Sequence, residues 1–139
     1  MIGVNSLSWV YMATDELNKA RKILEEKRAL LGKNYHWRLA WALLLALENK
    51  RDDALRAMDQ ETLKWADANF FVTLRAAEFY AVLGDTSKAI EWLDRAVRKG
   101  DERVEWFRKN PRLASIRNDP SFQRIIDSIQ ARRKQRQGK

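Results

Sequence analysis

The sequence predicts an all-α fold built from antiparallel helix pairs, and three observations favour it. Ala20, Ala54 and Ala89 stand 34 and 35 residues apart, a spacing typical of repeat folds whose unit is one helix pair. Each alanine lies in a stretch where apolar residues recur every three or four positions, the period of an amphipathic helix. The 139 residues include only five Gly and two Pro, which disfavours a loop-rich or all-β fold.

The first predicted pair spans residues 2–33. Its two helices are separated by a turn near Thr14–Asp15, and Gly32 closes the second helix. Because the first helix begins close to Met1, we expect the sequence to be part of a longer array.

The second predicted pair spans residues 34–67. Asn34 precedes a helix over 36–47 that is apolar nearly all round, which is typical of a central, buried helix. Asn49 stands at the turn, where Asn tolerates the left-handed conformation. The partner helix is expected to continue without a break as far as Trp65.

The third predicted pair spans residues 69–100 and has the clearest helix-ending and helix-capping residues. Its first helix is expected over Phe71–Leu83, and Gly84–Asp85 then ends it. Gly suits the left-handed position after a helix, and Asp85 can cap the next helix, which Gly100 closes.

Small residues are expected where the two helices of each pair cross, because a short side chain lets the backbones approach. The predicted facing pairs, each 12 residues apart, are Ser8 with Ala20, Ala42 with Ala54, and Ala77 with Ala89.

Beyond residue 100 the pattern changes to C-terminal capping helices over 101–131. Asp101 can cap a short helix, and Asn110–Pro111 and Asp119–Pro120 each place an N-cap residue before a Pro at the first helical position. Solenoids need such an atypical terminal unit to close their apolar end. Residues 132–139 are predicted to be a basic, frayed tail.

The third pair resembles the tetratricopeptide repeat, which has a small residue at position eight, an aromatic at eleven, Gly-Asp in the turn and Ala at twenty. The second pair departs from that motif at Leu45 and Glu61, and the first at Lys27. The resemblance covers roughly residues 2–100 and implies a right-handed α-solenoid of three helix pairs. Its structural repeat positions here are Ser8, Ala20, Ala42, Ala54, Ala77, Tyr80, Gly84, Ala89 and Ala96.

Residues 92–133 resemble the closing element of tetratricopeptide arrays in bacterial multidomain proteins. The matching pieces are Gly-Asp-Glu-Arg at 100–103, Trp106–Phe107, Asn110–Pro111 and Asn-Asp-Pro at 118–120. Such arrays often follow a serine/threonine kinase, a winged-helix regulator or a cyclase. The resemblance therefore implies the C-terminal part of a bacterial regulatory protein.

In that family, partners bind a concave groove lined by the first helix of each pair. Carried over by position, the groove residues are Trp9, Met12, His36, Leu39, Leu43, Phe71, Leu74, Arg75 and Glu78. This largely apolar surface suits an amphipathic helix, a peptide or another copy of the chain, and it requires Leu43 and Leu74 to be accessible. Alternatively, neighbouring repeats or a preceding domain cover it.

The six Trp are interpreted by their surroundings. Trp37, Trp41, Trp65, Trp92 and Trp106 lie in apolar periodic stretches and are expected in the core, whereas Trp9 is a candidate contact residue.

The sequence shows no pattern of an enzyme, so no catalytic residues, metal ligands or cofactor are predicted. His36 is the single His, Cys is absent, and the five Gly are scattered rather than gathered in a phosphate-binding loop. The acidic pairs Asp52–Asp53 and Asp101–Glu102 stand at expected helix starts, where capping is their ordinary role. We predict a non-catalytic scaffold that binds a protein or peptide.

Charge supports a second hypothesis, binding to nucleic acid or another anionic surface. The net charge is +8, and the basic residues of the C-terminal region are Arg108, Lys109, Arg112, Arg117, Arg124, Arg132, Arg133, Lys134, Arg136 and Lys139. This hypothesis is the less favoured, because no recognition-helix motif or interleaved aromatic residues accompany the charge.

The sequence predicts a soluble, cytoplasmic protein. The longest apolar run, residues 40–47, is well short of the roughly 20 residues that span a bilayer. No secretory signal precedes it, and the absence of Cys fits a reducing compartment.

Overall fold

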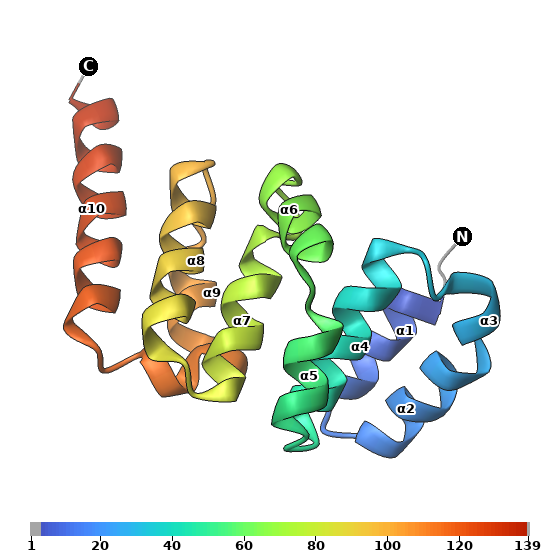
Figure 1. The fold of residues 1–139 in the computed structure, drawn as a ribbon. Coiled ribbons are helices and arrows are strands. Elements are labelled where there is room, and N and C mark those ends of the chain that lie inside the picture. Colours follow the sequence, from blue (N-terminus) through green and yellow to red (C-terminus); the bar gives the residue numbers. More distant parts are fainter. Residues whose placement is uncertain (1–3, 139) are drawn as a thin grey trace. The chain divides into compact units, whose positions relative to one another are not determined.

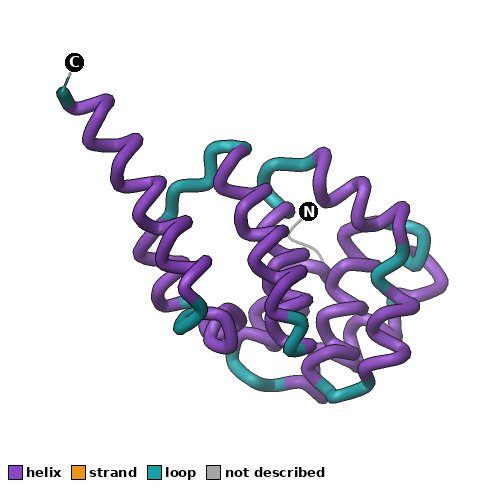
Figure 2. The backbone as a smooth tube through the Cα atoms, turned by 60° about the vertical axis from the view of Figure 1, so that its left-hand side comes forward, coloured by secondary structure: helices purple, strands orange, loops and turns teal. Residues whose placement is uncertain are grey.

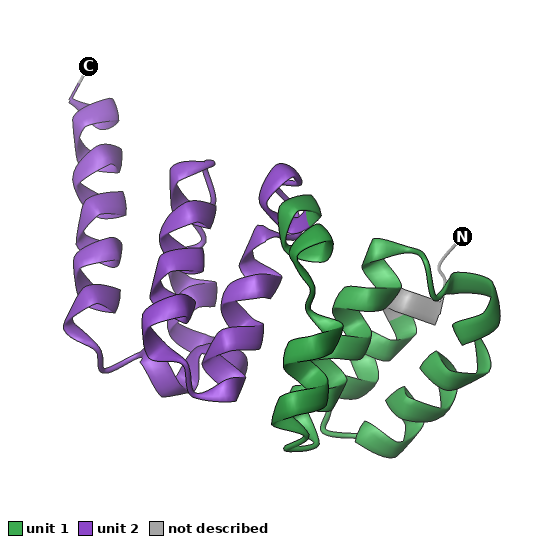
Figure 3. Cartoon of the chain, viewed as in Figure 1, with its two compact units in different colours: residues 1–65 green, residues 66–139 purple. Residues whose placement is uncertain are grey.

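The computed structural model describes the backbone of residues 4–138 and the side chains of residues 7–138. Helices joined by short loops make up this part of the chain, and it contains no strand (Figures 1 and 2). The all-α prediction is confirmed. The chain forms two compact units, residues 1–65 and 66–139 (Figure 3), and each is described by itself.

Unit 1 contains two packed helix pairs. Its helices are α1 (Val4–Ala13), α2 (Leu17–Glu26), α3 (Arg28–Leu31), α4 (Tyr35–Leu47) and α5 (Arg51–Ala57), and α6 (Gln60–Ala68) begins in it. Helix α1 packs on α2, and α4 packs on α5. Helix α4 also contacts α1 and α2, so it forms the centre of the unit.

The core of unit 1 lies around α4, which the sequence predicts to be apolar nearly all round. Leu39, Leu43 and Leu44 are each at most 1% exposed. The Trp37 ring is also buried, and its Nε1–H donates to the carbonyl oxygen of Leu24 at 3.0 Å. The indole therefore buries its apolar area without leaving its polar N–H unpaired.

Unit 2 contains the third pair and the C-terminal segment. Its helices are α7 (Thr73–Leu83), α8 (Thr86–Arg98), α9 (Val104–Lys109), the 3₁₀ helix η1 (Pro111–Ile116) and α10 (Pro120–Gln137). Helix α8 packs on α7, η1 contacts both α7 and α8, and α10 lies against α8. Because the C-terminal segment packs on the third pair, these elements form one unit instead of separating after residue 100.

The turns reproduce the spacing of the alanines. Asp15, Asn49 and Gly84 adopt left-handed backbone angles, with φ of 61°, 63° and 82°. They stand 34 and 35 residues apart, as Ala20, Ala54 and Ala89 do. All six small residues expected at the crossings are 0% exposed. Each pair thus turns and closes at equivalent positions.

Three predicted helix caps, at Asp85, Asn110 and Asp119, are present, and Asn34 forms a further one. The side chains of Asn34, Asp85, Asn110 and Asp119 each accept a hydrogen bond from a backbone N–H two or three residues ahead. Asp101 does not cap α9 directly, since the N-cap position is held by Arg103. The Asp101 carboxylate instead forms an ion pair with the Arg103 guanidinium at 2.7 Å.

The prediction of one continuous helix through Trp65 is wrong, because α5 ends at Ala57 and α6 begins at Gln60. The Asp59 carboxylate accepts from the backbone N–H of Thr62 at 2.9 Å and from its hydroxyl at 2.7 Å. This is the bonding of an N-cap, and it starts a new helix.

The prediction of a frayed tail over 132–139 is also not what the structure shows, because α10 continues to Gln137. The Glu102 carboxylate pairs with the guanidinium groups of Arg133 and Arg136. These ion pairs attach the last turns of α10 to the loop before α9. Hydrogen bonding to Arg136 lowers the pKa of Glu102 below its ordinary value. Lys139 lies outside the described residues.

Candidate partner-binding cleft

Much of the groove predicted by position is buried. Leu43 and Leu74, which that groove requires on an accessible surface, are 1% and 4% exposed. Met12, Leu39 and Glu78 are each 1% exposed. Side chains buried this deeply cannot contact a partner, so the assignment of these five residues to an accessible groove is wrong.

In unit 2, the chain itself covers the predicted face of α7. The Asn110 amide donates to Glu78 Oε2 at 3.1 Å, and the Ser115 hydroxyl donates to the carbonyl oxygen of Ala81 at 2.7 Å. Arg75, which is partly exposed, donates to the other carboxylate oxygen of Glu78 at 3.1 Å. The charged pair expected at the end of the groove is therefore part of an internal network.

The other predicted groove residues remain accessible to different degrees. Phe71 is 88% exposed, because it lies in the loop before α7 and not on the helix. Trp9 is partly exposed, and His36 is exposed with its ring 4.6 Å from that of Trp65 in an edge contact. The structure does not gather these residues into one site within either unit.

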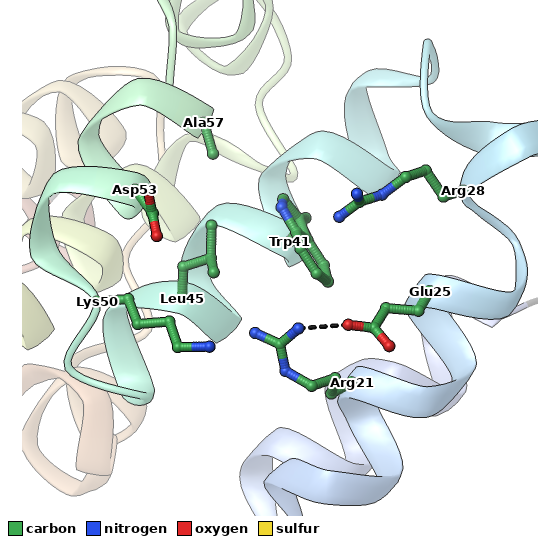
Figure 4. Close-up of a pocket in the computed structure, with 8 residues that line it drawn as sticks. All are labelled: Arg21, Glu25, Arg28, Trp41, Leu45, Lys50, Asp53 and Ala57. Atoms are coloured by element: carbon green, nitrogen blue, oxygen red, sulfur yellow. Dashed lines mark hydrogen bonds and ion pairs between the residues drawn. The ribbon is translucent and has the colours of Figure 1, made fainter.

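Unit 1 instead contains an open cleft over the outer face of α4, between α2 and α3 on one side and α5 on the other (Figure 4). One cavity, of about 380 Å³, is lined by Arg21, Glu25, Arg28, Trp41, Leu45, Lys50, Asp53 and Ala57. An adjoining cavity of about 340 Å³ shares Trp41 and Ala57 and adds Gly32, Trp37, Arg38, Arg56 and Asp59. We call the two together the Trp41 cleft.

Aromatic and guanidinium groups gather at the centre of the Trp41 cleft. The Trp41 ring stacks on that of Trp37, with centroids 5.4 Å apart and planes within 11°. Arg28 Cζ lies 4.4 Å from the Trp41 centroid, and Arg21 Cζ lies 5.0 Å from it. Because Trp37 is buried, it fixes the orientation of the partly exposed Trp41 ring. Cation–π attraction also holds the two guanidinium groups near the ring.

Arg28 is positioned by the short helix α3. It is the first residue of that helix, and Gly32 caps the helix end. A Cβ at position 32 would come within 2.6 Å of the Arg28 carbonyl oxygen, so this close approach requires Gly.

The Arg21 side chain connects α2 to the end of α4. Its Nε donates to Glu48 Oε2 at 2.8 Å, a second guanidinium nitrogen bonds the other carboxylate oxygen, and a third contact reaches Glu25. The hydrogen bonds between the two side chains lower the pKa of Glu48 and raise the pKa of Arg21. The Arg21 side chain therefore lines the cleft in a fixed position, and the Glu48 carboxylate compensates its charge.

The charge of Arg28 is not compensated in this way. No carboxylate among residues 7–138 forms an ion pair with it, and its close contacts are the faces of Trp37 and Trp41. Lys50 lies 3.6 Å from Glu48, a longer contact than that of Arg21. The Trp41 cleft thus offers an aromatic face beside two cations with spare hydrogen-bond donors.

Sequence reasoning missed Trp41 because it assigned this residue to the core. The available signal was the wide apolar stripe of α4, which is apolar nearly all round and includes Trp37, Trp41 and Leu45. Such a stripe is wider than one packed neighbour can cover, but the sequence does not say which part stays open.

No three His, Asp or Glu side chains in residues 7–138 lie together in an arrangement that suits a metal ion. Within the same part of the chain, every helix is too short or too polar to cross a bilayer.

No protein-family model, curated protein or solved structure matches the chain.

Proposed function

We propose that this chain is a non-catalytic interaction module that binds a peptide or protein segment in the Trp41 cleft. The observation that supports it is the partly exposed Trp41 ring, which stacks on the buried Trp37 indole and has two guanidinium groups close to it. Trp and Arg are the residues most enriched among energetic anchors of interfaces. A ring already fixed by packing loses little side-chain freedom when a partner binds.

The repeat pattern supports the wider part of the proposal, a tetratricopeptide-like scaffold. The left-handed turns and the buried small residues recur after 34 and 35 residues, close to the 34-residue length of that repeat. We propose that the pairs belong to a right-handed solenoid at the C-terminal end of a cytoplasmic bacterial regulatory protein. The binding surface in this proposal is the Trp41 cleft and not the buried groove.

A peptide selection tests the proposed function. A random peptide library is selected on the whole chain, and the enriched peptides are measured against Trp41→Ala and Trp106→Ala. Trp106 is the matched control, since it is an exposed Trp of unit 2. We expect binding to weaken about tenfold or more in Trp41→Ala, equivalent to about 1.4 kcal/mol, and to persist in Trp106→Ala. Peptides that bind both variants as well as the wild type would contradict the proposal.

The ordered end of α10 favours a second candidate function, binding to a polyanion. Arg132, Arg133, Lys134 and Arg136 lie on its last turns, and Glu102 is the carboxylate that pairs with two of them. The last buried residue of α10 is Ile129, so removing residues 131–139 spares the core. Binding of random duplex DNA near 150 mM salt that this truncation abolishes would support the candidate. No binding of the full chain would dismiss it.

A further inference from the structure

We propose that the Trp41 cleft recognises an acidic peptide segment in which a carboxylate side chain stands next to an aromatic or large apolar one. This inference rests on the proposed function and names the chemistry of the partner. It follows from the charges, the apolar surface and the shape of the cleft, taken in turn.

The carboxylates that line the first cavity are already paired, whereas its cations are in surplus. Glu25 accepts from Arg21, and Asp53 accepts from Arg56. Arg28 has no carboxylate partner among residues 7–138, and Lys50 makes only a 3.6 Å contact with Glu48. A ligand carboxylate that enters here therefore finds donors that need not break a close ion pair.

The position of Arg28 on the Trp41 ring favours a planar anion. The Arg28 guanidinium forms no hydrogen bond or ion pair within residues 7–138, so its N–H groups remain available to a ligand. Two parallel N–H donors match the two oxygens of a carboxylate, which makes such a pair geometrically specific. Ring and cation stand together, so an apolar group and a carboxylate can bind side by side.

The shape favours a peptide over a compact small molecule. The two cavities adjoin at Trp41 and Ala57, so the accessible surface continues from Lys50 to Arg38 across α4. Ala57, which is partly exposed, supplies apolar contact beside the Trp41 indole. A continuous surface with alternating charged and apolar parts suits successive side chains of an extended segment.

Fluorescence anisotropy with defined peptides tests the inference on the whole chain. The probes are fluorescein-labelled hexapeptides of alternating Glu and Phe, of alternating Gln and Phe, and of alternating Glu and Ala. We expect the Glu–Phe peptide to bind at least fivefold more tightly than either of the others. Arg28→Gln is expected to remove the preference for Glu over Gln. Lys22→Gln, which removes an exposed cation of α2 outside the cleft, should preserve it.

Each result bears on the inference separately from the proposed function. Equal binding of the Glu–Phe and Gln–Phe peptides, with both lost in Trp41→Ala, would overturn the inference and leave the proposed function standing. Binders from the random library that lack Glu and Asp would do the same. A dimer of the wild-type chain that Trp41→Ala dissociates, measured by sedimentation, would identify a second copy as the occupant and overturn the inference. Unchanged circular dichroism of Arg28→Gln would show that a loss of preference is not a loss of folding.

Discussion

The two units treat their central helices differently. Helices α4 and α7 each bury eight side chains, so each is the core of its unit. In unit 2 the chain's own C-terminal segment covers α7 through η1 and its N-cap residue Asn110. In unit 1 the outer face of α4 stays open as the Trp41 cleft. A helix pair cannot cover both faces of its central helix, so the remaining face needs another partner.

The chemistry of the two faces differs accordingly. The segment that covers α7 contributes fully buried apolar side chains, Phe107, Leu113 and Ile116, together with the buried amide of Asn110. The Trp41 cleft presents a partly exposed indole with charged groups around it. The covered face of α7 is therefore closed by buried apolar side chains and satisfied hydrogen bonds, whereas the Trp41 cleft is lined by charged groups and an indole that tolerate contact with water.

The largest predicted effect comes from a substitution in the C-terminal segment of unit 2. Phe107→Ala removes a ring that is 0% exposed, and we expect a loss of about 3–5 kcal/mol in the free energy of unfolding. Urea unfolding followed by circular dichroism measures it. Trp106→Ala, at a neighbouring side chain that is 41% exposed, is the control and should cost clearly less. Equal losses would show that α9 is not packed as described.

The next effect concerns the buried polar contact between the C-terminal segment and α7. Asn110→Ala removes the donor to Glu78 and also the cap of η1, so we expect a loss of about 2–3 kcal/mol. The comparison is Asp119→Ala, which removes a cap of the same kind and should cost about 1 kcal/mol. Chemical denaturation of both variants decides whether the bond to Glu78 contributes beyond capping.

The pH dependence of the free energy of unfolding tests the contact between Glu48 and Arg21 at the Trp41 cleft. Hydrogen bonding to Arg21 lowers the pKa of Glu48, so the unfolded chain binds this proton more readily than the folded one. The resulting stability is present above the ordinary pKa of Glu, near 4.5, and is lost as the pH falls through the lower folded pKa. Glu48→Gln should therefore cost roughly 1–2 kcal/mol at pH 7 and progressively less below about pH 4.5.

Urea titrations of wild type and variant at pH 7 and pH 3 measure this difference. Glu25→Gln is the matched control, because it removes the more exposed partner of the same arginine and should have a smaller effect. A Glu48→Gln loss that does not change with pH would contradict the assignment.

The smallest effects compare the turns of the two units. A Cβ at Gly84 would meet no atom within 4 Å, so Gly84→Ala should cost about 1 kcal/mol, from left-handed strain alone. Asn49→Gly relieves the same strain in unit 1 and should gain roughly 0.5 kcal/mol. Thermal melts of the two variants should shift in opposite directions, and shifts of the same sign would refute the equivalence of the turns.

Local features of the fold could be predicted because each depends on residues near in sequence. The left-handed turn at Asn49 and the caps at Asp85 and Asp119 follow from side chains that bond or bend their own backbone. The break after Ala57 has a local cause too, since Asp59 and Thr62 have the spacing of a cap. It was missed because the helical periodicity continues across it.

By itself, the sequence determined the all-α class, the helix pairs and the places where they turn and cross, since propensity, capping and periodicity act over a few residues. Only the tertiary structure decided which faces are open. Leu43 and Trp41 both lie on α4 and are both apolar, yet the first is buried and the second lines a cleft. Accessibility depends on which elements, distant in sequence, pack over a side chain, and that choice is made by the fold as a whole.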